Sequence, residues 1–81
     1  MKLSFTPNFT RHYNDAPKRI QKAFDKQSGL LLHDLRHPSL RAKKYDESRD
    51  LWQARVTGDW RFYFSIVDDT YLIQGVTKHP K

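Results

Sequence analysis

The stretch from Leu51 to Lys81, LWQARVTGDWRFYFSIVDDTYLIQGVTKHPK, decides the fold, because its apolar residues recur at the period of β-strands. Three runs of this kind occupy residues 51–57, 60–67 and 70–77. Thr57-Gly58-Asp59 and Asp68-Asp69 separate the runs and are short enough to be hairpin loops. The segment therefore predicts three consecutive strands in an antiparallel meander.

The pleat of these strands assigns each side chain to one face of the sheet. In the first two strands the apolar series must face the core, and it comprises Trp52, Ala54, Val56, Trp60, Phe62, Phe64 and Ile66. Arg55, Arg61 and Tyr63 then share the opposite face. In the last strand the core face takes Leu72 and Val76, and the outer face takes Tyr71, Ile73, Gly75, Thr77 and His79. Gly75 would leave that surface without a side chain, which lets a ligand approach closely.

The chain before this segment predicts one strand and two helices. Residues 2–6 form a short strand, and Thr6 is a suitable cap for a helix that takes Pro7 at its first position. A second helix is predicted by apolar residues at helical spacing from Ile20 to about Leu35. Gly29 weakens the middle of that helix, where we expect either a bend or a break.

These elements together predict an α+β domain in the order β-α-α-β-β-β, an antiparallel sheet with two helices packed on one face. Residues 42–45 offer a further short strand. Because 81 residues supply one hydrophobic core, we expect a single domain over residues 1–81. The uncovered face of the sheet is where we expect the functional site.

The composition narrows the class of protein. Fifteen Lys and Arg residues against nine Asp and Glu give a net charge of +6, which favours a polyanionic partner or an acidic protein. The absence of cysteine excludes disulfides, thiolate metal sites and a cysteine nucleophile. No apolar run approaches the roughly 20 residues that span a bilayer, and residues 1–10 lack the features of a signal peptide. We expect a cytoplasmic protein with no membrane segment, no metal and no small-molecule cofactor.

Five short motifs lie along the chain, each occurring once. They are His37-Pro38-Ser39-Leu40, Lys43-Lys44, Leu51-Trp52-Gln53-Ala54-Arg55-Val56, Gly58-Asp59-Trp60-Arg61-Phe62-Tyr63-Phe64 and Lys78-His79-Pro80-Lys81. In these motifs the chain resembles the RelE/ParE superfamily of small bacterial toxins, most strongly between Trp52 and Phe64. The resemblance implies the same fold and an acidic, partly disordered antitoxin. For the RelE-like branch it also implies ribosome-dependent cleavage of messenger RNA.

The resemblance also suggests which residues carry the activity. Arg55 and Arg61 match the two arginines of the main motif, and His79 falls near a tail position that the family fills with a basic residue or histidine. Lys43 and Lys44 stand where the family places basic residues before the meander. Some RelE-like members use a tail tyrosine, whereas here no tyrosine follows Tyr71, which leaves the proton-transfer group open.

The chemistry leads to the same residues. Metal-independent RNA cleavage needs a base for the ribose 2′-hydroxyl, an acid for the leaving oxygen and cations for the phosphate. Arginine binds two phosphate oxygens at once, and histidine titrates near neutral pH. We therefore expect Arg61 and Arg55 to be phosphate clamps and His79 to be the acid or base. The expected substrate-binding residues are Lys43, Lys44, Tyr63 and Lys78.

Other interpretations fit the same residues. A ParE-like domain would inhibit DNA gyrase through protein contacts without hydrolysing RNA, and a toxin-derived domain that has lost activity would only bind a partner. Surface arginines are common on half-exposed sheets, a histidine near the chain end is often solvated, and edge lysines discourage aggregation. The cations of the second helix are interpreted as a solvated face that could touch ribosomal RNA: Lys18, Arg19, Lys22 and Lys26. His12 and His33 are interpreted as structural.

Overall fold

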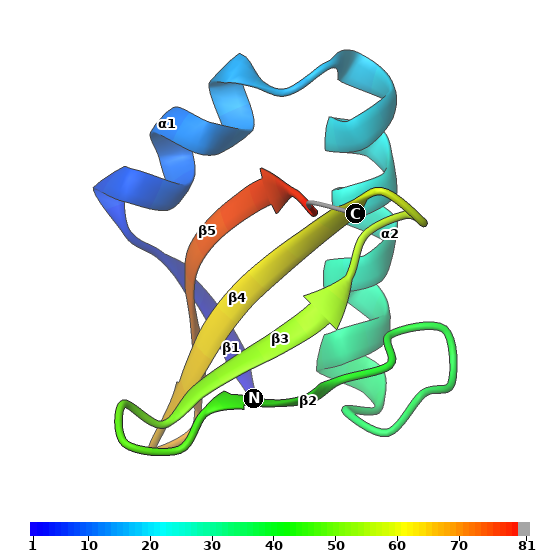
Figure 1. Ribbon diagram of the computed structural model, residues 1–81. Helices are drawn as coiled ribbons and strands as arrows, with labels where there is room; N and C mark the ends of the chain where they lie inside the picture. Colours follow the sequence, from blue (N-terminus) through cyan, green and yellow to red (C-terminus); the bar gives the residue numbers. More distant parts are fainter. Residues whose placement is uncertain (80–81) are drawn as a thin grey trace.

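The computed structural model describes residues 1–79, which form two helices and a five-stranded sheet (Figure 1). In chain order the elements are β1 (Lys2–Phe5), α1 (Pro7–Asp15), α2 (Lys18–His33), β2 (Lys43–Asp46), β3 (Leu51–Arg55), β4 (Trp60–Val67) and β5 (Thr70–Lys78). The last two residues of the closing motif, Pro80 and Lys81, lie outside the described residues. No helix in the described part is long and apolar enough to cross a membrane.

The sheet has the strand order β1-β5-β4-β3-β2. The predicted meander is present as β3, β4 and β5, which pair antiparallel in sequence order, and β2 adds an antiparallel edge strand. At the other edge β1 pairs parallel with β5, so the sheet is mixed rather than wholly antiparallel. In Figure 1, α2 runs behind the sheet and α1 lies beside β5. The α+β class and the order of its helices and strands are confirmed.

The helices begin where the sequence predicts. The Thr6 hydroxyl accepts a hydrogen bond from the Phe9 N–H at 3.1 Å, and Pro7 occupies the first turn of α1. Helix α2 is continuous through Gly29, which is exposed and has open space around it. The helix ends at His33, two residues before the predicted end at Leu35.

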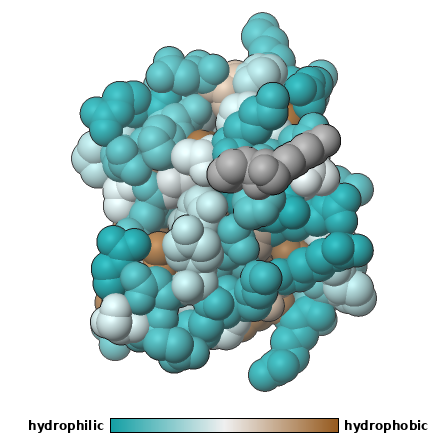
Figure 2. All heavy atoms as spheres, viewed as in Figure 1, coloured by the Kyte–Doolittle hydropathy of each residue, from teal (hydrophilic) through white to brown (hydrophobic). Residues whose placement is uncertain are grey.

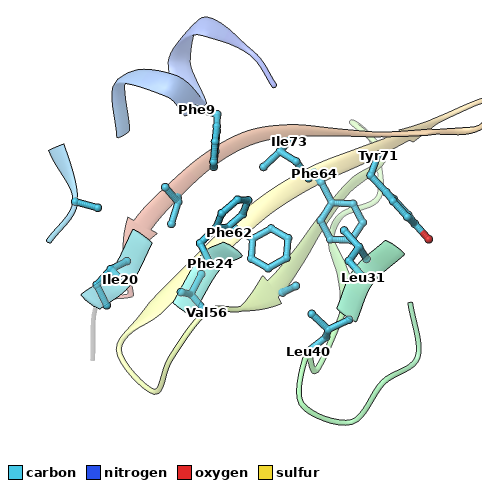
Figure 3. Packing of buried hydrophobic residues seen from close by; sticks show 13 residues of the cluster. Phe9, Ile20, Phe24, Leu31, Leu40, Val56, Phe62, Phe64, Tyr71 and Ile73 are labelled. Carbon is cyan, nitrogen blue, oxygen red and sulfur yellow. The ribbon is translucent and has the colours of Figure 1, made fainter. Parts of the chain in front are cut away.

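The core lies between the sheet and the two helices (Figure 3). Phe62 and Phe64 of β4 are fully buried, and the Phe24 ring of α2 meets Phe62 edge to face with 5.2 Å between ring centroids. Phe9 of α1 packs against Phe24 with a centroid separation of 4.9 Å. Edge-to-face and tilted aromatic pairs of this kind favour one packing arrangement over others. Both helices are therefore held on the face of the sheet that carries Phe62 and Phe64.

A β-bulge changes the phase of β5. Tyr63 pairs with Gly75, but the next residue, Phe64, pairs with Ile73, so Gln74 has no direct partner on β4. Because of this extra residue, the residues of β5 that precede Gln74 point to the face opposite the one expected from simple alternation. The predicted faces of Tyr71, Leu72 and Ile73 are consequently wrong: Tyr71 and Ile73 are buried in the core, and Leu72 lies opposite Ser65 on the outer side. Val76 and Thr77, beyond the bulge, have the predicted faces.

Helix α1 covers the edge of β5 beside the bulge. The Asn8 amide donates to the Gln74 carbonyl at 2.9 Å, and the Val76 N–H donates to His12 Nδ1 at 3.3 Å. A Cβ atom at Gly75 would lie only 3.1 Å from His12 Nδ1. The close approach predicted at Gly75 thus exists, but the α1 imidazole occupies the space instead of a ligand. His12 has the structural role that the sequence indicated.

Candidate functional site

Arg55 and Arg61 stand directly opposite each other at the turn end of the β3–β4 hairpin. Both are half-buried, and both lie on the face opposite Phe62. Like charges directly opposite on neighbouring strands destabilise a sheet. Retention of two arginines here is therefore a cost in stability, as expected where an anion is bound.

The two guanidinium groups have different surroundings. Arg61 Nη1 donates to three carbonyl oxygens of the turn: Thr57 at 2.6 Å, Trp60 at 3.0 Å and Gly58 at 3.2 Å. Arg55 Nη2 lies over Gly58, at 3.7 Å from the position of a Cβ atom there. Arg61 therefore fixes the turn through one nitrogen, while Arg55 extends along a cavity.

That cavity has a volume of about 570 Å³ and lies at the edge of the sheet, next to the start of β2. Its walls are α2, residues 38–41 of the loop before β2, and the β3–β4 turn. Three cationic side chains line it, contributed by Lys26, Arg41 and Arg55. The site was expected on the uncovered face of the sheet, whereas Arg55 lines a corner between a helix and two loops. Viewed as in Figure 1, the surface is mostly hydrophilic (Figure 2).

The buried side chain of Gln27 holds this corner together. Its amide donates to the Arg55 carbonyl at 2.8 Å and to the Ser39 carbonyl at 3.1 Å, and its oxygen accepts from the Ser39 hydroxyl at 3.3 Å. A second link joins the same parts, since the Arg55 N–H donates to the Leu40 carbonyl at 2.7 Å. Buried polar groups satisfied in this way rigidify their surroundings. Helix α2, the loop and the end of β3 form one unit around the cavity.

His79 reaches the other side of the same turn. Its backbone N–H donates to the Asp59 carbonyl at 2.5 Å, and the preceding strand places Thr77 opposite Arg61. Within residues 1–79, Nδ1 of the half-buried His79 imidazole is shielded from solvent and has no hydrogen-bond partner. Unpaired buried polar atoms are rare and costly, and functional sites are one place where they occur. The backbone of His79 is therefore bonded to the same turn that Arg55 and Arg61 flank.

The predicted substrate-binding residues are divided between the two faces. Lys43 pairs with Gln53, on the arginine face, and Tyr63 lies there too, with its ring 5.2 Å from that of the exposed Tyr45. Lys44 pairs with Trp52 and therefore lies on the helix face. Lys78 pairs with Trp60, so it is also separated from the arginines. The register thus brings Lys43 and Tyr63 to the arginine face and places Lys44 and Lys78 elsewhere.

Lys44 has local partners that account for its position. Its ammonium bonds the Asp50 carboxylate and lies 5.5 Å from the centroid of the Trp52 ring. The hydrogen bond to Asp50 is the main reason why the pKa of Lys44 is raised. These contacts favour the structural interpretation of Lys44 as a charged edge-strand residue.

The sequence does not predict that Lys26 and Arg41 line the cavity. It indicates a solvated helix face for Lys26 and gives no signal for Arg41. Only the fold places Lys26 opposite the turn, because α2 and β3 are far apart in the sequence. Arg41 has a φ angle of 47°, a left-handed conformation that costs a non-glycine residue about 1 kcal/mol. No sequence signal indicates this conformation at an arginine.

The arrangement can bind an anion and move a proton. Guanidinium groups bind phosphate oxygens in pairs, and an imidazole near them can exchange a proton with a bound hydroxyl. Among the described residues, no group of three His, Asp or Glu side chains is placed to hold a metal ion.

No protein-family model and no curated protein sequence matches this chain. Solved structures do resemble it. A YoeB/ParE toxin from Agrobacterium tumefaciens superposes with a TM-score of 0.81 at 14% identity, over 99% of this chain and 100% of that one. RelE in an archaeal RelE–RelB complex from Pyrococcus horikoshii OT3 gives 0.80 at 18%, over 99% and 96%. YafQ in the E. coli DinJ–YafQ toxin–antitoxin complex gives 0.78 at 13%, over 95% and 90%.

The similarity in structure extends over nearly the whole of each chain, whereas the similarity in sequence is low. The fold implied by the resemblance of the Trp52–Phe64 motif is thereby confirmed. This chain has the fold found in the YoeB/ParE, RelE and YafQ toxin structures.

Proposed function

We propose that this protein is the toxin of a toxin–antitoxin pair and cleaves messenger RNA on the ribosome without a metal ion. The observation that carries the proposal is that Arg55 and Arg61 flank one hairpin turn, to which the backbone of His79 is also hydrogen-bonded. The fold shared with YoeB, RelE and YafQ toxins supports the toxin role. The net charge of +6 suits both an RNA substrate and an acidic antitoxin.

In the proposed reaction the ribose 2′-hydroxyl attacks the adjacent phosphorus. A bond forms between the 2′-oxygen and phosphorus, the bond from phosphorus to the 5′-oxygen breaks, and a 2′,3′-cyclic phosphate results. One proton leaves the 2′-hydroxyl and one reaches the 5′-oxygen, and His79 carries one of these transfers. Arg55 binds the non-bridging oxygens, where charge accumulates in the transition state.

Arg61 has a supporting role in this proposal. Its Nη1 is committed to the carbonyls of Thr57, Gly58 and Trp60, so it holds the turn that positions Arg55 and His79. Its positive charge still favours an anion at the turn, because the guanidinium stays ionised.

The partner implied by this function is an acidic, partly disordered antitoxin. An acidic segment that folds over the cationic site would neutralise it and stabilise the domain by binding only the folded state. The similar solved structures include the toxin–antitoxin complexes DinJ–YafQ from E. coli and RelB–RelE from Methanococcus jannaschii.

The test uses purified protein, translating ribosomes and a reporter message whose 5′ ends are mapped by primer extension. The wild-type protein should cut the message, and Arg55→Gln and His79→Gln should each reduce the rate at least about 100-fold, the scale of a lost oxyanion donor or proton carrier. Arg11→Gln, which removes an exposed cation of α1, is the control and should cut normally. Uncut message with wild-type protein and translating ribosomes would reject the nuclease function.

A second candidate is a domain that binds without hydrolysing, either a ParE-like gyrase inhibitor or an inactive relative. The observation in its favour is that three turn carbonyls already occupy Arg61 Nη1, which leaves less of this guanidinium for a phosphate. Induction of the chain in cells separates the candidates. Blocked supercoiling with intact transcripts indicates gyrase inhibition, and normal growth with both intact indicates a domain without toxicity.

A further inference from the structure

The cavity beside Arg55 carries more positive charge than one phosphate needs. Lys26, Arg41 and Arg55 line it from three different elements: α2, the loop before β2 and the end of β3. Cations gathered in one cavity repel one another unless an anion lies between them. Within residues 1–79, no acidic side chain lines this cavity.

The backbone at Arg41 gives a second, independent observation. Among the described residues, three non-glycine residues have a positive φ, and the other two, Asp50 and Asp68, are of a type that tolerates this conformation. Arginine has no such tolerance, and glycine would be the less strained choice. Backbone strain of this kind persists only where the surrounding structure enforces it, and it clusters at functional sites.

The cavity is also built to hold its shape. Gln27 links the α2 wall to the carbonyls of Ser39 and Arg55, and the Leu40 carbonyl accepts the Arg55 N–H. Arg41 follows Leu40 directly, so these bonds fix its backbone position relative to Arg55. A volume of about 570 Å³ leaves room for a sugar and its phosphate.

We propose that Arg41 and Lys26 form a second phosphate subsite, which binds the backbone phosphate next to the one held by Arg55 on the same RNA strand. This inference rests on the proposed function. It adds two positioning residues that hold the strand by its backbone, which makes the contact independent of base identity. It implies that the arginine at position 41 favours RNA binding and at the same time lowers the stability of the fold.

The binding test uses a short, fluorescent, single-stranded RNA whose 2′-hydroxyls are all methylated, so that it binds but cannot be cleaved. Fluorescence anisotropy across a series of salt concentrations gives the affinity and its salt dependence. Arg41→Gln and Lys26→Gln should each weaken binding about threefold to tenfold at low salt and lower the slope of log affinity against log salt by about 0.7. Arg11→Gln removes one positive charge from α1, far from this cavity, and should change neither quantity appreciably.

A stability measurement separates a binding role from a structural one. Arg41→Gly should raise the urea midpoint of unfolding, because it relieves the left-handed strain, while it weakens RNA binding as Arg41→Gln does. Asp68→Gly, at a φ of 54°, is the matched backbone control and should change the midpoint less, since aspartate tolerates this conformation better. A lower midpoint for Arg41→Gly would overturn the strain argument and with it the assignment of Arg41.

Two further outcomes would overturn the proposal. If Arg41→Gln binds the methylated RNA as the wild type does, the cavity holds no second phosphate. If the substitution weakens only co-sedimentation with empty ribosomes, Arg41 contacts ribosomal RNA instead of the bound strand. Neither result depends on cleavage. The experiments can therefore reject the second phosphate subsite while the nuclease function holds, or reject the nuclease function while the subsite holds.

Discussion

Arg55 and Arg61 face each other directly across the β3–β4 ladder, yet only Arg61 uses its guanidinium to bond the turn. The pair therefore combines one stabilising and one destabilising arginine. Both arginines carry the same positive charge, but we expect their replacement to change the stability of the fold in opposite directions.

Arg55→Gln should raise the free energy of unfolding at low salt, because it removes a like-charge cross-strand pair and keeps much of the side-chain stem. We expect a gain of about 0.3–0.5 kcal/mol, reduced from the range for exposed pairs because solvent screens both charges. Urea unfolding at low salt and at ~1 M salt provides the measurement, and the gain should nearly vanish at high salt. A loss of stability at both salt concentrations would show that Arg55 is needed for folding.

Arg61→Gln should have the opposite effect. The carbonyls of Thr57, Gly58 and Trp60 lose their common donor, and we expect unfolding to become easier by about 1–2 kcal/mol. Hydrogen exchange should also accelerate at the amides of residues 57–59, which report opening of the turn. Arg61→Lys should restore part of the stability, since an ammonium also donates hydrogen bonds. Unchanged exchange in Arg61→Gln would contradict a role in holding the turn.

Gly75→Ala should destabilise the fold through contact with α1. The added Cβ would lie 3.1 Å from His12 Nδ1, tighter than normal packing, and the expected cost is about 1–2 kcal/mol. In a His12→Ala background the same change should cost less, because the obstructing ring is gone. A double-mutant cycle by urea unfolding measures this coupling, which we expect to be about 0.5–2 kcal/mol. Strictly additive effects would mean that the imidazole does not limit the space above Gly75.

Asp46 should make stability depend on acidity. Its carboxylate accepts from the Ser48 hydroxyl at 2.7 Å and from Arg49 Nε at 2.9 Å, and the Ser48 bond is the largest cause that lowers the pKa of Asp46 below 3.8. A lowered folded-state pKa stabilises the fold above the unfolded value, and this stabilisation is lost as pH falls through the folded value. Asp46→Asn should therefore be less stable than wild type at neutral pH, with the gap closing in strong acid.

Comparison of urea midpoints at neutral pH and in strong acid, well below pH 3.8, tests this expectation. The Ser48→Ala background is the control, because without the hydroxyl the Asp46→Asn difference should shrink. A gap that is equally large at both pH values would assign the effect of Asp46 to packing instead of charge.

Several parts of the fold were predictable because their signals are local. The positions of β3 and β4, the Thr6 cap and the loop at Gly58 each depend on neighbours within a few residues, and the structure contains all of them. The bulge at Gln74 was not predictable, because it depends on pairing with β4 and on the α1 residues that cover the strand edge. The phase error at Tyr71 and Ile73 follows directly from it.

The sequence by itself determined the order of helices and strands, the cationic character of the domain and the common face of Arg55, Arg61 and Tyr63. Pleating fixes such facts within one strand or one hairpin. Only the tertiary structure decided that Lys26 and Arg41 join Arg55 around one cavity and that Lys44 does not. The reason is physical: the register of an edge strand and the packing of a helix against a turn depend on contacts between segments distant in the chain, which local periodicity does not encode.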